Sequence, residues 1–309
     1  MIIYQKIPGH QFEYAQCCKG ILNENEPIGF RSTFGIFRFI FARRIFVVTI
    51  DNCLITFFIF SILRSAFGMR TVGILIRSNN IHLATIRHRV KKGLLRTLRL
   101  LKEVRVINII DPDFVLNHNL YFNEYIPDLM LYSAKKKSQQ KPHFNSVDTP
   151  NIENEIRKIN FVGFITPEKG REKLLSFLSR NPNITLEHYG AVPDFDGKHP
   201  PENIRHNGWY NTNEESEIFD GETPTWCYFE SGYDLSSAAF CKSLKSGNLP
   251  ILRQGSYLES IAKKNRLTYL LLQDERLFLI NGSATGAQCY VNQANLDIVR
   301  ILKNEYFEK

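Results

Sequence analysis

Short apolar segments alternate along this chain with longer segments in which apolar and polar positions recur at helical spacing. In the first half, strands are predicted over residues 2–7, 45–50, 71–76 and 104–110, and helices over 11–22, 53–66 and 86–102. Such alternation is typical of a parallel sheet with helices on both faces.

The same alternation resumes after a polar segment that is poor in large apolar residues. Strands are predicted over residues 158–163, 184–189, 203–206, 223–230, 248–252 and 268–272, and helices over 168–180, 212–219, 236–246, 256–264 and 293–307. We therefore predict an α/β protein with two doubly wound, Rossmann-like domains that face each other across a cleft. The predicted domains are residues 1–132 and 157–290, with a linker over 133–156 and a terminal helix over 291–309.

The segment from Tyr233 to Leu252 has the features of a ligand site. Ser236 or Ser237 can cap the N-terminus of an apolar helix that Gly247 ends. The free N–H groups of that helix are expected where a parallel strand ends, which is where an anion is stabilised. Any βαβ unit needs a cap and a stop, so the pattern favours an α/β domain more strongly than a phosphate site.

Composition narrows the class of protein. Hydrophobic residues make up 43% of the chain and charged residues 23%, which is normal for a globular protein. The six cysteines form no C-x-x-C pair, so neither a disulfide framework nor a metal site is expected, and we predict a cytoplasmic protein. Asp51, Asn52 and Arg64 interrupt the most apolar stretch, which therefore predicts a strand and a largely buried helix rather than a membrane span.

Positive charge is concentrated in the first half. Residues 1–109 contain 17 Lys or Arg and 5 Asp or Glu, a net charge of +12, so the remainder of this +8 chain has −4. Such a field attracts polyanions or an acidic membrane surface. Within it, residues 86–102 predict a basic helix with an apolar stripe of Ile86, Val90, Leu94, Leu98 and Leu101. That stripe favours contact with the inner leaflet of a membrane, although burial against the sheet explains it equally well.

Four segments in the second half resemble a known family. FVGFITPEKGREKLL, LEHYGAVPDF, NIRHNGWY and YDLSSAAFCKSLKSGNLPIL resemble, in order and spacing, the C-terminal domain of GT-B glycosyltransferases of the retaining E-x7-E type. The resemblance spans roughly residues 158–272, and KIPGHQFEYA resembles the opening of the acceptor domain in bacterial polysaccharide glycosyltransferases.

The resemblance implies roles for particular residues. Lys169 falls on a lysine that grips the donor diphosphate, whereas Phe164 replaces the partner arginine. Asp234 falls on the first Glu, near the transferred sugar, and Lys242 on the second, which holds the ribose hydroxyls. The reversed charge at 242 admits two interpretations: Lys242 contacts the diphosphate in place of the arginine, or standard donor binding is lost.

The remaining candidates lie at predicted strand ends. Gly163, Gly190, Ser236 and Ser237 are expected to shape the nucleotide-sugar site through the backbone. On the acceptor side, His10 follows the first strand and can act as a base or hold a hydroxyl, and Asp51 ends another strand. No cofactor or metal is expected, because the nucleotide-sugar is a donor substrate and basic residues and helix dipoles can stabilise its diphosphate.

The resemblance therefore implies a glycosyltransferase of hexosyltransferase type. It would act on a lipid-linked or oligosaccharide acceptor in O-antigen, capsule or exopolysaccharide synthesis, at the cytoplasmic face of the inner membrane. Two alternatives stay open. Phe164 and Lys242 favour a catalytically degenerate scaffold protein, and the positive field favours a nucleic-acid-binding protein, although no recognition motif supports nucleic acid as a partner.

Overall fold

The computed structural model describes residues 1–6, 11–76, 86–110, 121–132, 155–192, 201–211, 214–231, 237–283 and 285–307. The chain divides into two compact units. Unit 1 comprises Met1–Lys136 and Asn292–Lys309, and unit 2 comprises Lys137–Val291. Each unit contains one sheet.

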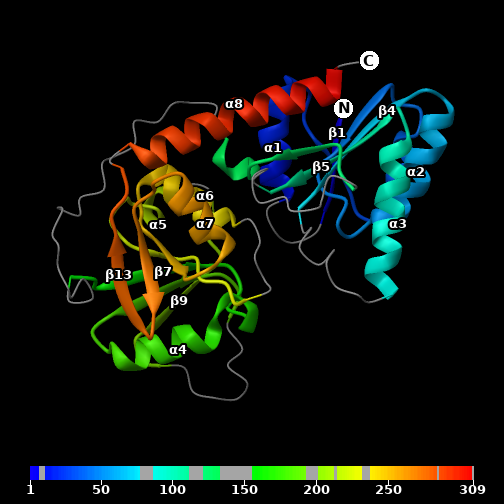
Figure 1. Cartoon of the computed structure of the whole chain (residues 1–309). Helices are drawn as coiled ribbons and strands as arrows, with labels where there is room; N and C mark the ends of the chain where they lie inside the picture. The colour runs from blue at the N-terminus through cyan, green and yellow to red at the C-terminus, as the bar shows by residue number, and fades with distance from the viewer. Residues whose placement is uncertain are drawn as a thin grey trace. The chain divides into compact units, whose positions relative to one another are not determined.

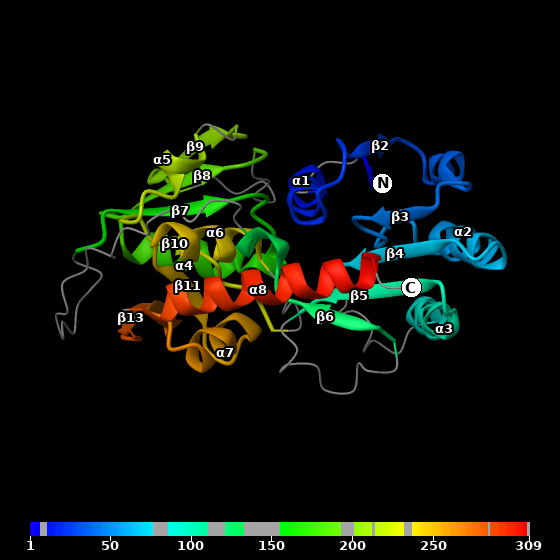
Figure 2. The ribbon, with the colours of Figure 1, turned by 90° about the horizontal axis from the view of Figure 1, so that it is seen from above.

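Unit 1 contains a six-stranded parallel sheet in the order β2-β1-β3-β4-β5-β6 (Figure 2). The elements in chain order are β1 (Ile2–Gln5), α1 (Gln11–Leu22), β2 (Ile28–Phe30), the 3-10 helix η1 (Thr33–Phe39), β3 (Arg44–Val47), α2 (Leu54–Ala66), β4 (Arg70–Leu75), α3 (Ile86–Leu100), β5 (Val104–Ile109), β6 (Glu124–Ile126) and the 3-10 helix η4 (Leu129–Leu131). The four predicted strands are confirmed. The sequence analysis missed β2 and β6, which have three residues each and form the two edges of the sheet.

Different helices cover the two faces of this sheet. Val47 of β3 packs with Phe57 of α2 and Leu95 of α3 in one buried cluster. The neighbouring Phe46 points to the opposite face because side chains alternate along a strand, and its ring meets that of Tyr306 at a centroid distance of 6.1 Å. Tyr306 belongs to α8 (Gly286–Phe307), so the end of the chain completes the core of unit 1.

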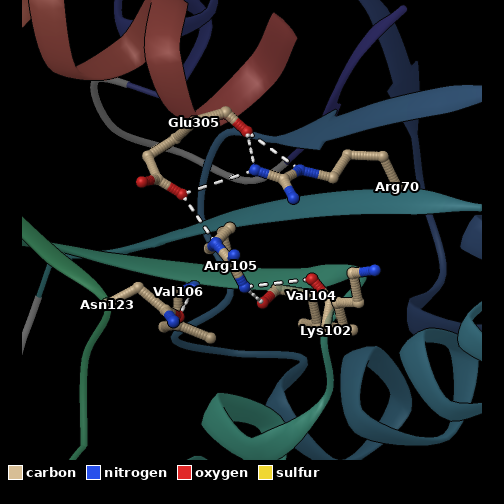
Figure 3. Close-up of polar contacts among 7 residues, drawn as sticks. All are labelled: Arg70, Lys102, Val104, Arg105, Val106, Asn123 and Glu305. Atoms are coloured by element: carbon tan, nitrogen blue, oxygen red, sulfur yellow. Dashed lines mark hydrogen bonds and ion pairs between the residues drawn. The ribbon is translucent and has the colours of Figure 1, made fainter. Parts of the chain in front are cut away.

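Polar contacts fix the end of α8 on the sheet (Figure 3). The carbonyl oxygen of Glu305 accepts hydrogen bonds from Nη2 and Nε of Arg70 at 2.8 and 3.1 Å. Its carboxylate lies 3.0 Å from Nε of Arg105 and 3.6 Å from Nη2 of Arg70. One residue near the C-terminus therefore connects with both β4 and β5.

Unit 2 contains a seven-stranded sheet in the order β13-β12-β11-β10-β7-β8-β9. The elements in chain order are β7 (Lys158–Val162), the 3-10 helix η6 (Pro167–Lys169), α4 (Arg171–Arg180), β8 (Thr185–Tyr189), β9 (Ile204–Gly208), α5 (Glu215–Ile218), β10 (Thr225–Trp226), α6 (Ala238–Ser246), β11 (Pro250–Arg253), α7 (Tyr257–Lys264), β12 (Tyr269–Gln273) and β13 (Arg276–Ile280) (Figure 1). All the strand pairs are parallel except β12 with β13, whose antiparallel pairing was not predicted. The predicted fold class, two α/β units built on parallel sheets, is confirmed.

Helix α2 differs from its prediction in one respect. Arg64, which interrupts the apolar segment, is fully buried, and its guanidinium donates to the carbonyl oxygens of Ile40 and Arg70 and to the hydroxyl of Thr71. The opposite face of the helix, which was predicted to be largely buried, is exposed and apolar. Among the described helices, none combines the length and the apolar character that crossing a membrane requires.

Candidate functional site

The carboxyl ends of β7, β8, β9 and β10 lie at one edge of the unit 2 sheet, because these strands are parallel. We call this the carboxyl edge of unit 2. After β7, Gly163 adopts a φ of 102°, which favours glycine, and the chain then forms η6 and ends it at Lys169. The first predicted site residues thus lie in a tight loop between a central strand and α4.

Lys169 points back toward the end of β7. Its Nζ lies 3.0 Å from the position that a Cβ atom on Gly163 would occupy, and 5.9 Å from the centroid of the Phe161 ring. Its carbonyl oxygen accepts a hydrogen bond of 3.1 Å from the indole of Trp226 in β10. The lysine backbone is therefore held by β10 while its ammonium lies beside Gly163.

The charge of Lys169 acts on a buried thiol after β10. Burial raises the pKa of the Cys227 thiol, and the positive charge of Lys169 and a hydrogen bond from Ser243 of α6 act in the opposite direction. Lys169 and Ser243 of α6 therefore both act on the thiol that follows β10.

Gly190, at the end of β8, is required by close packing rather than by its backbone angles. A Cβ atom there would lie 2.2 Å from the carbonyl oxygen of Gly163 and 2.8 Å from its carbonyl carbon. Both contacts are shorter than van der Waals separation, and both atoms belong to the backbone. The two predicted glycines therefore contact each other, and the loop after β7 is fixed against the loop after β8.

A pair of hydrogen-bonded histidines, His188 and His206, supports the contact between Gly163 and Gly190. His188 is buried in β8, and its Nε2 lies 2.7 Å from the carbonyl oxygen of Gly163, so Nε2 carries the proton and donates. Its Nδ1 then accepts from Nδ1 of His206 in β9, at 3.0 Å. Burial lowers the pKa of His188, and the charges of His206 and Lys169 lower it further, against the opposing effect of the Gly163 hydrogen bond. His188 is accordingly neutral near pH 7.

Helix α6 begins and ends as the sequence predicts. The Oγ of Ser237 accepts a hydrogen bond from the N–H of Phe240 at 3.3 Å, which makes Ser237 the N-cap. Gly247, with a φ of 88°, is the C-cap. The other predicted residues of this region, Asp234 and Ser236, lie outside the described residues, as does His10 in unit 1.

Lys242 is buried in the second turn of α6 and belongs to a three-residue polar cluster. Its ammonium lies 3.0 Å from Oε2 of Glu215 in α5 and donates to the hydroxyl of Tyr210 at 3.1 Å. Its Nζ also lies 5.5 Å from the Tyr210 ring centroid. Tyr210 and Glu215 were not predicted, because their contact with Lys242 joins elements that are distant in the sequence.

Two exposed aromatic side chains lie together at the carboxyl edge. Phe164 follows β7 and Trp209 follows β9, and their rings are in edge-to-face contact at a centroid distance of 5.4 Å. The side chain of Phe164 is 52% exposed and that of Trp209 is 57% exposed. The residue that replaces the expected arginine therefore forms an aromatic pair that is open to solvent.

Asp51, the acceptor-side candidate that the structure describes, follows β3 in unit 1. Its Oδ2 accepts hydrogen bonds from the N–H of Ile76 at 2.9 Å and the hydroxyl of Thr49 at 3.0 Å. These bonds connect the loops after β3 and β4. Asp51 thus has a positioning role, and its predicted catalytic role stays a prediction.

Comparisons with known structures show a distant similarity in fold. No protein-family model matches the chain, and no curated protein sequence matches it. Several solved glycosyltransferase structures are similar in fold over nearly the whole chain. An α-glucosyltransferase in complex with UDP-glucose and DNA containing an abasic site is 10% identical, with a TM-score of 0.49, and the match covers 99% of this chain and 93% of that one.

Two further structures show the same level of similarity. The glycosyltransferase of kitacinnamycin is 9% identical, with a TM-score of 0.45 and coverage of 99% of this chain and 94% of that chain. The catalytic domain of starch synthase IV from Arabidopsis thaliana, bound to ADP and acarbose, is 9% identical, with a TM-score of 0.45 and coverage of 98% and 75%. At these values the similarity concerns the fold alone.

Proposed function

We propose that this protein is a glycosyltransferase that moves a sugar from a nucleotide-sugar to a lipid-linked or oligosaccharide acceptor in surface polysaccharide synthesis. One observation carries the proposal. The ammonium of Lys169 lies beside Gly163, at the same sheet edge as the N-terminus of α6, which Ser237 caps. A cation and a set of helix N–H groups at the ends of parallel strands suit a diphosphate.

The chemistry requires stabilisation of a leaving group rather than covalent catalysis. When the glycosidic bond to the diphosphate breaks, negative charge grows on the phosphate oxygens and the sugar ring becomes oxocarbenium-like. Lys169 and the first N–H groups of α6 would stabilise the former. Asp234, by its place in the resemblance, would stabilise the latter, and His10 would serve the acceptor hydroxyl.

The aromatic pair and the polar cluster suggest how the rest of the donor is bound. Phe164 and Trp209 expose π-faces on which a nucleobase can stack, an interaction worth about 1–3 kcal/mol per base. Lys242 is engaged by Glu215, so we assign the diphosphate to Lys169 rather than to Lys242. The Glu215 carboxylate, which is partly exposed, can accept hydrogen bonds from ribose hydroxyls in place of the carboxylate that Lys242 replaces.

The test is a panel of nucleotide-sugars, assayed for hydrolysis and for transfer, together with binding of the matching nucleoside diphosphates. We expect one donor to be turned over and Lys169→Ala to reduce turnover about 100-fold with little change in melting temperature. Lys173→Ala is the matched control, because Lys173 is an exposed lysine of α4.

The panel also separates the alternatives. Failure of every donor, with no thermal shift from any nucleoside diphosphate, would contradict the proposal and favour a degenerate scaffold. Tight, salt-dependent binding of random duplex DNA in the absence of nucleotide binding would favour a nucleic-acid-binding protein instead.

A further inference from the structure

Helix α2 of unit 1 has an exposed apolar face. Large apolar side chains recur at i, i+4, i+7, i+8 and i+12 from Ile55, a spacing that places them on one side of a helix. They are Ile55, Ile59, Ile62, Leu63 and, at the C-cap, Phe67. Ile55 and Phe67 are each 63% exposed. Phe57 and Phe60, on the other side of the helix, are fully buried in the core of unit 1.

The chain around η1 extends this face. Arg64 connects the two segments, because its guanidinium donates to the carbonyl oxygen of Ile40 from within α2. Phe41, which is 77% exposed, has its ring 6.5 Å from that of Phe67. Phe34 of η1 is also exposed. We call the exposed residues Phe34, Phe41, Ile55, Ile59, Ile62, Leu63 and Phe67 the α2 patch.

The surroundings of the α2 patch are strongly basic. Residues 31–102 contain fourteen Lys or Arg and a single acidic residue, Asp51. Arg38 and Arg43 are exposed on the chain that carries Phe34 and Phe41. On α3, which packs beside α2 (Figure 1), the exposed basic residues with described side chains are Arg89, Arg96 and Arg99.

The apolar stripe of α3 itself has a different role. Leu98 is fully buried, and Leu94 and Leu101 pack against the core of unit 1, whereas Val90 is exposed. Most of the apolar stripe of α3, for which the sequence favoured membrane contact, therefore packs against the core of unit 1. Helix α3 supplies cations, and the apolar contact has to come from α2.

We propose that the α2 patch is a binding face for an anionic lipid bilayer. Large apolar side chains with exposed arginines on the neighbouring segments are what a helix lying in a membrane interface requires: the apolar groups enter the acyl boundary while the cations meet anionic headgroups. The 13 residues of α2 extend only about 20 Å, so the helix lies along the surface and does not cross it. This inference does not depend on the proposed transfer reaction.

Charge also decides against a second copy as the occupant. In a symmetric dimer the same face meets itself, so the arginines around one α2 patch would oppose those around the other. Asp51 is the one acidic residue in this stretch, and its carboxylate accepts hydrogen bonds from Ile76 and Thr49. A partner with excess negative charge matches this surface, and a lipid headgroup layer supplies that charge beside an apolar phase.

Vesicle co-sedimentation of the full chain tests the proposal without any sugar substrate. We expect binding to phosphatidylcholine vesicles that contain phosphatidylglycerol, weaker binding to phosphatidylcholine alone, and loss of binding at high salt. The triple substitution Ile55→Gln, Ile59→Gln and Leu63→Gln should weaken binding about tenfold or more. The matched control is Val192→Gln, Phe278→Gln and Leu296→Gln, which changes three apolar residues that are exposed elsewhere.

Four outcomes decide the matter. Retained vesicle binding in the α2 triple variant, or an equal loss in the control, would overturn the proposal, as would the absence of binding by the wild-type chain. A concentration-dependent dimer that the α2 substitutions dissociate, with no affinity for vesicles, would identify a protein interface instead. Thermal melts of both variants establish that they are folded, and turnover of a soluble donor by the α2 triple variant is expected to be unchanged.

Discussion

A buried arginine of unit 1, Arg64, and a buried lysine of unit 2, Lys242, have different kinds of partner. In unit 1, Arg64 donates to the carbonyl oxygens of Ile40 and Arg70 and to the Thr71 hydroxyl, all neutral acceptors. Burial lowers its pKa to about 10, so the guanidinium stays charged near pH 7. In unit 2, the Lys242 ammonium is matched by the Glu215 carboxylate. The neutral partners of Arg64 thus leave its positive charge uncompensated, whereas Glu215 compensates the charge of Lys242.

The difference agrees with the distribution of charge along the chain. Residues 1–109 carry a net charge of +12 and the remainder −4. The same type of sheet therefore supports two kinds of surface: a basic one beside exposed apolar helix residues in unit 1, and a balanced one beside the proposed donor site in unit 2. Topology fixes where loops meet, and side-chain charge decides what they can bind.

Among the substitutions that test this comparison, Arg64→Leu should have the largest effect on the free energy of unfolding. The substitution removes the donors from two backbone carbonyls and one hydroxyl that stay buried, and an unsatisfied buried group costs about 1–3 kcal/mol. We expect a loss of about 4 kcal/mol in the free energy of unfolding of unit 1, measured by urea denaturation. Exposed Arg38→Leu is the control, and equal stability of the two variants would show that Arg64 does not support the fold.

Gly190→Ala should have the next largest effect, and in unit 2. Its Cβ atom would lie 2.2 Å from the Gly163 carbonyl oxygen, so the loops after β7 and β8 must separate. Overpacking of this kind costs about 1–3 kcal/mol, and nucleotide affinity should fall with stability. Gly93→Ala is the matched change, because nothing lies within 4 Å of a Cβ atom there. Similar melting temperatures for the two variants would contradict the proposed contact.

Reversing one charge of the Lys242–Glu215 pair should lower the free energy of unfolding by a smaller amount. Reversing the second charge as well should restore part of that loss. Lys242→Glu places a second carboxylate beside the partly exposed Glu215, and we expect it to lower the free energy of unfolding by about 1 kcal/mol. The double variant Lys242→Glu with Glu215→Lys should recover at least half of that loss. If the double variant is as unstable as the sum of the single variants, the pair does not interact and the contrast with Arg64 fails.

The smallest expected effect is on the pH dependence of stability. The pKa of His188 is lowered from 6.5, chiefly by burial, so the unfolded chain binds a proton more readily than the folded one. Stability from this group is complete above 6.5 and is lost as pH falls toward the lowered value. Urea denaturation at about pH 8 and about pH 5 should therefore show a smaller acid loss for His188→Asn than for the wild type. An unchanged acid loss would mean that other groups dominate it.

Much of the fold follows from local sequence patterns. The bounds of α1 are the predicted ones, and Ser237 and Gly247 cap α6 as expected, because caps depend on neighbouring residues. The short edge strand β2 carries too few residues to show a period. The exposed face of α2 was missed because its apolar residues surround the whole helix, so periodicity cannot show which side is buried.

Less of the candidate site was predictable. The resemblance implied Gly163, Gly190 and Lys169 as site residues, and the structure brings Gly163 close to both of the others, while their roles stay predictions. The His188–His206 pair and the Glu215 partner of Lys242 depend on contacts between elements that are distant in the sequence, so no local pattern carries them. Trp209 carries one local signal, because it is a large aromatic residue just after a predicted strand.

Hydrogen–deuterium exchange of the full chain, with and without the nucleoside diphosphate that binds most tightly, tests the central claim most directly. The account predicts slower exchange at the backbone amides of residues 163–170 and 237–243, and loss of that protection in Lys169→Ala. Protection confined to unit 1, or protection in unit 2 that Lys169→Ala leaves intact, would contradict a diphosphate site at this sheet edge.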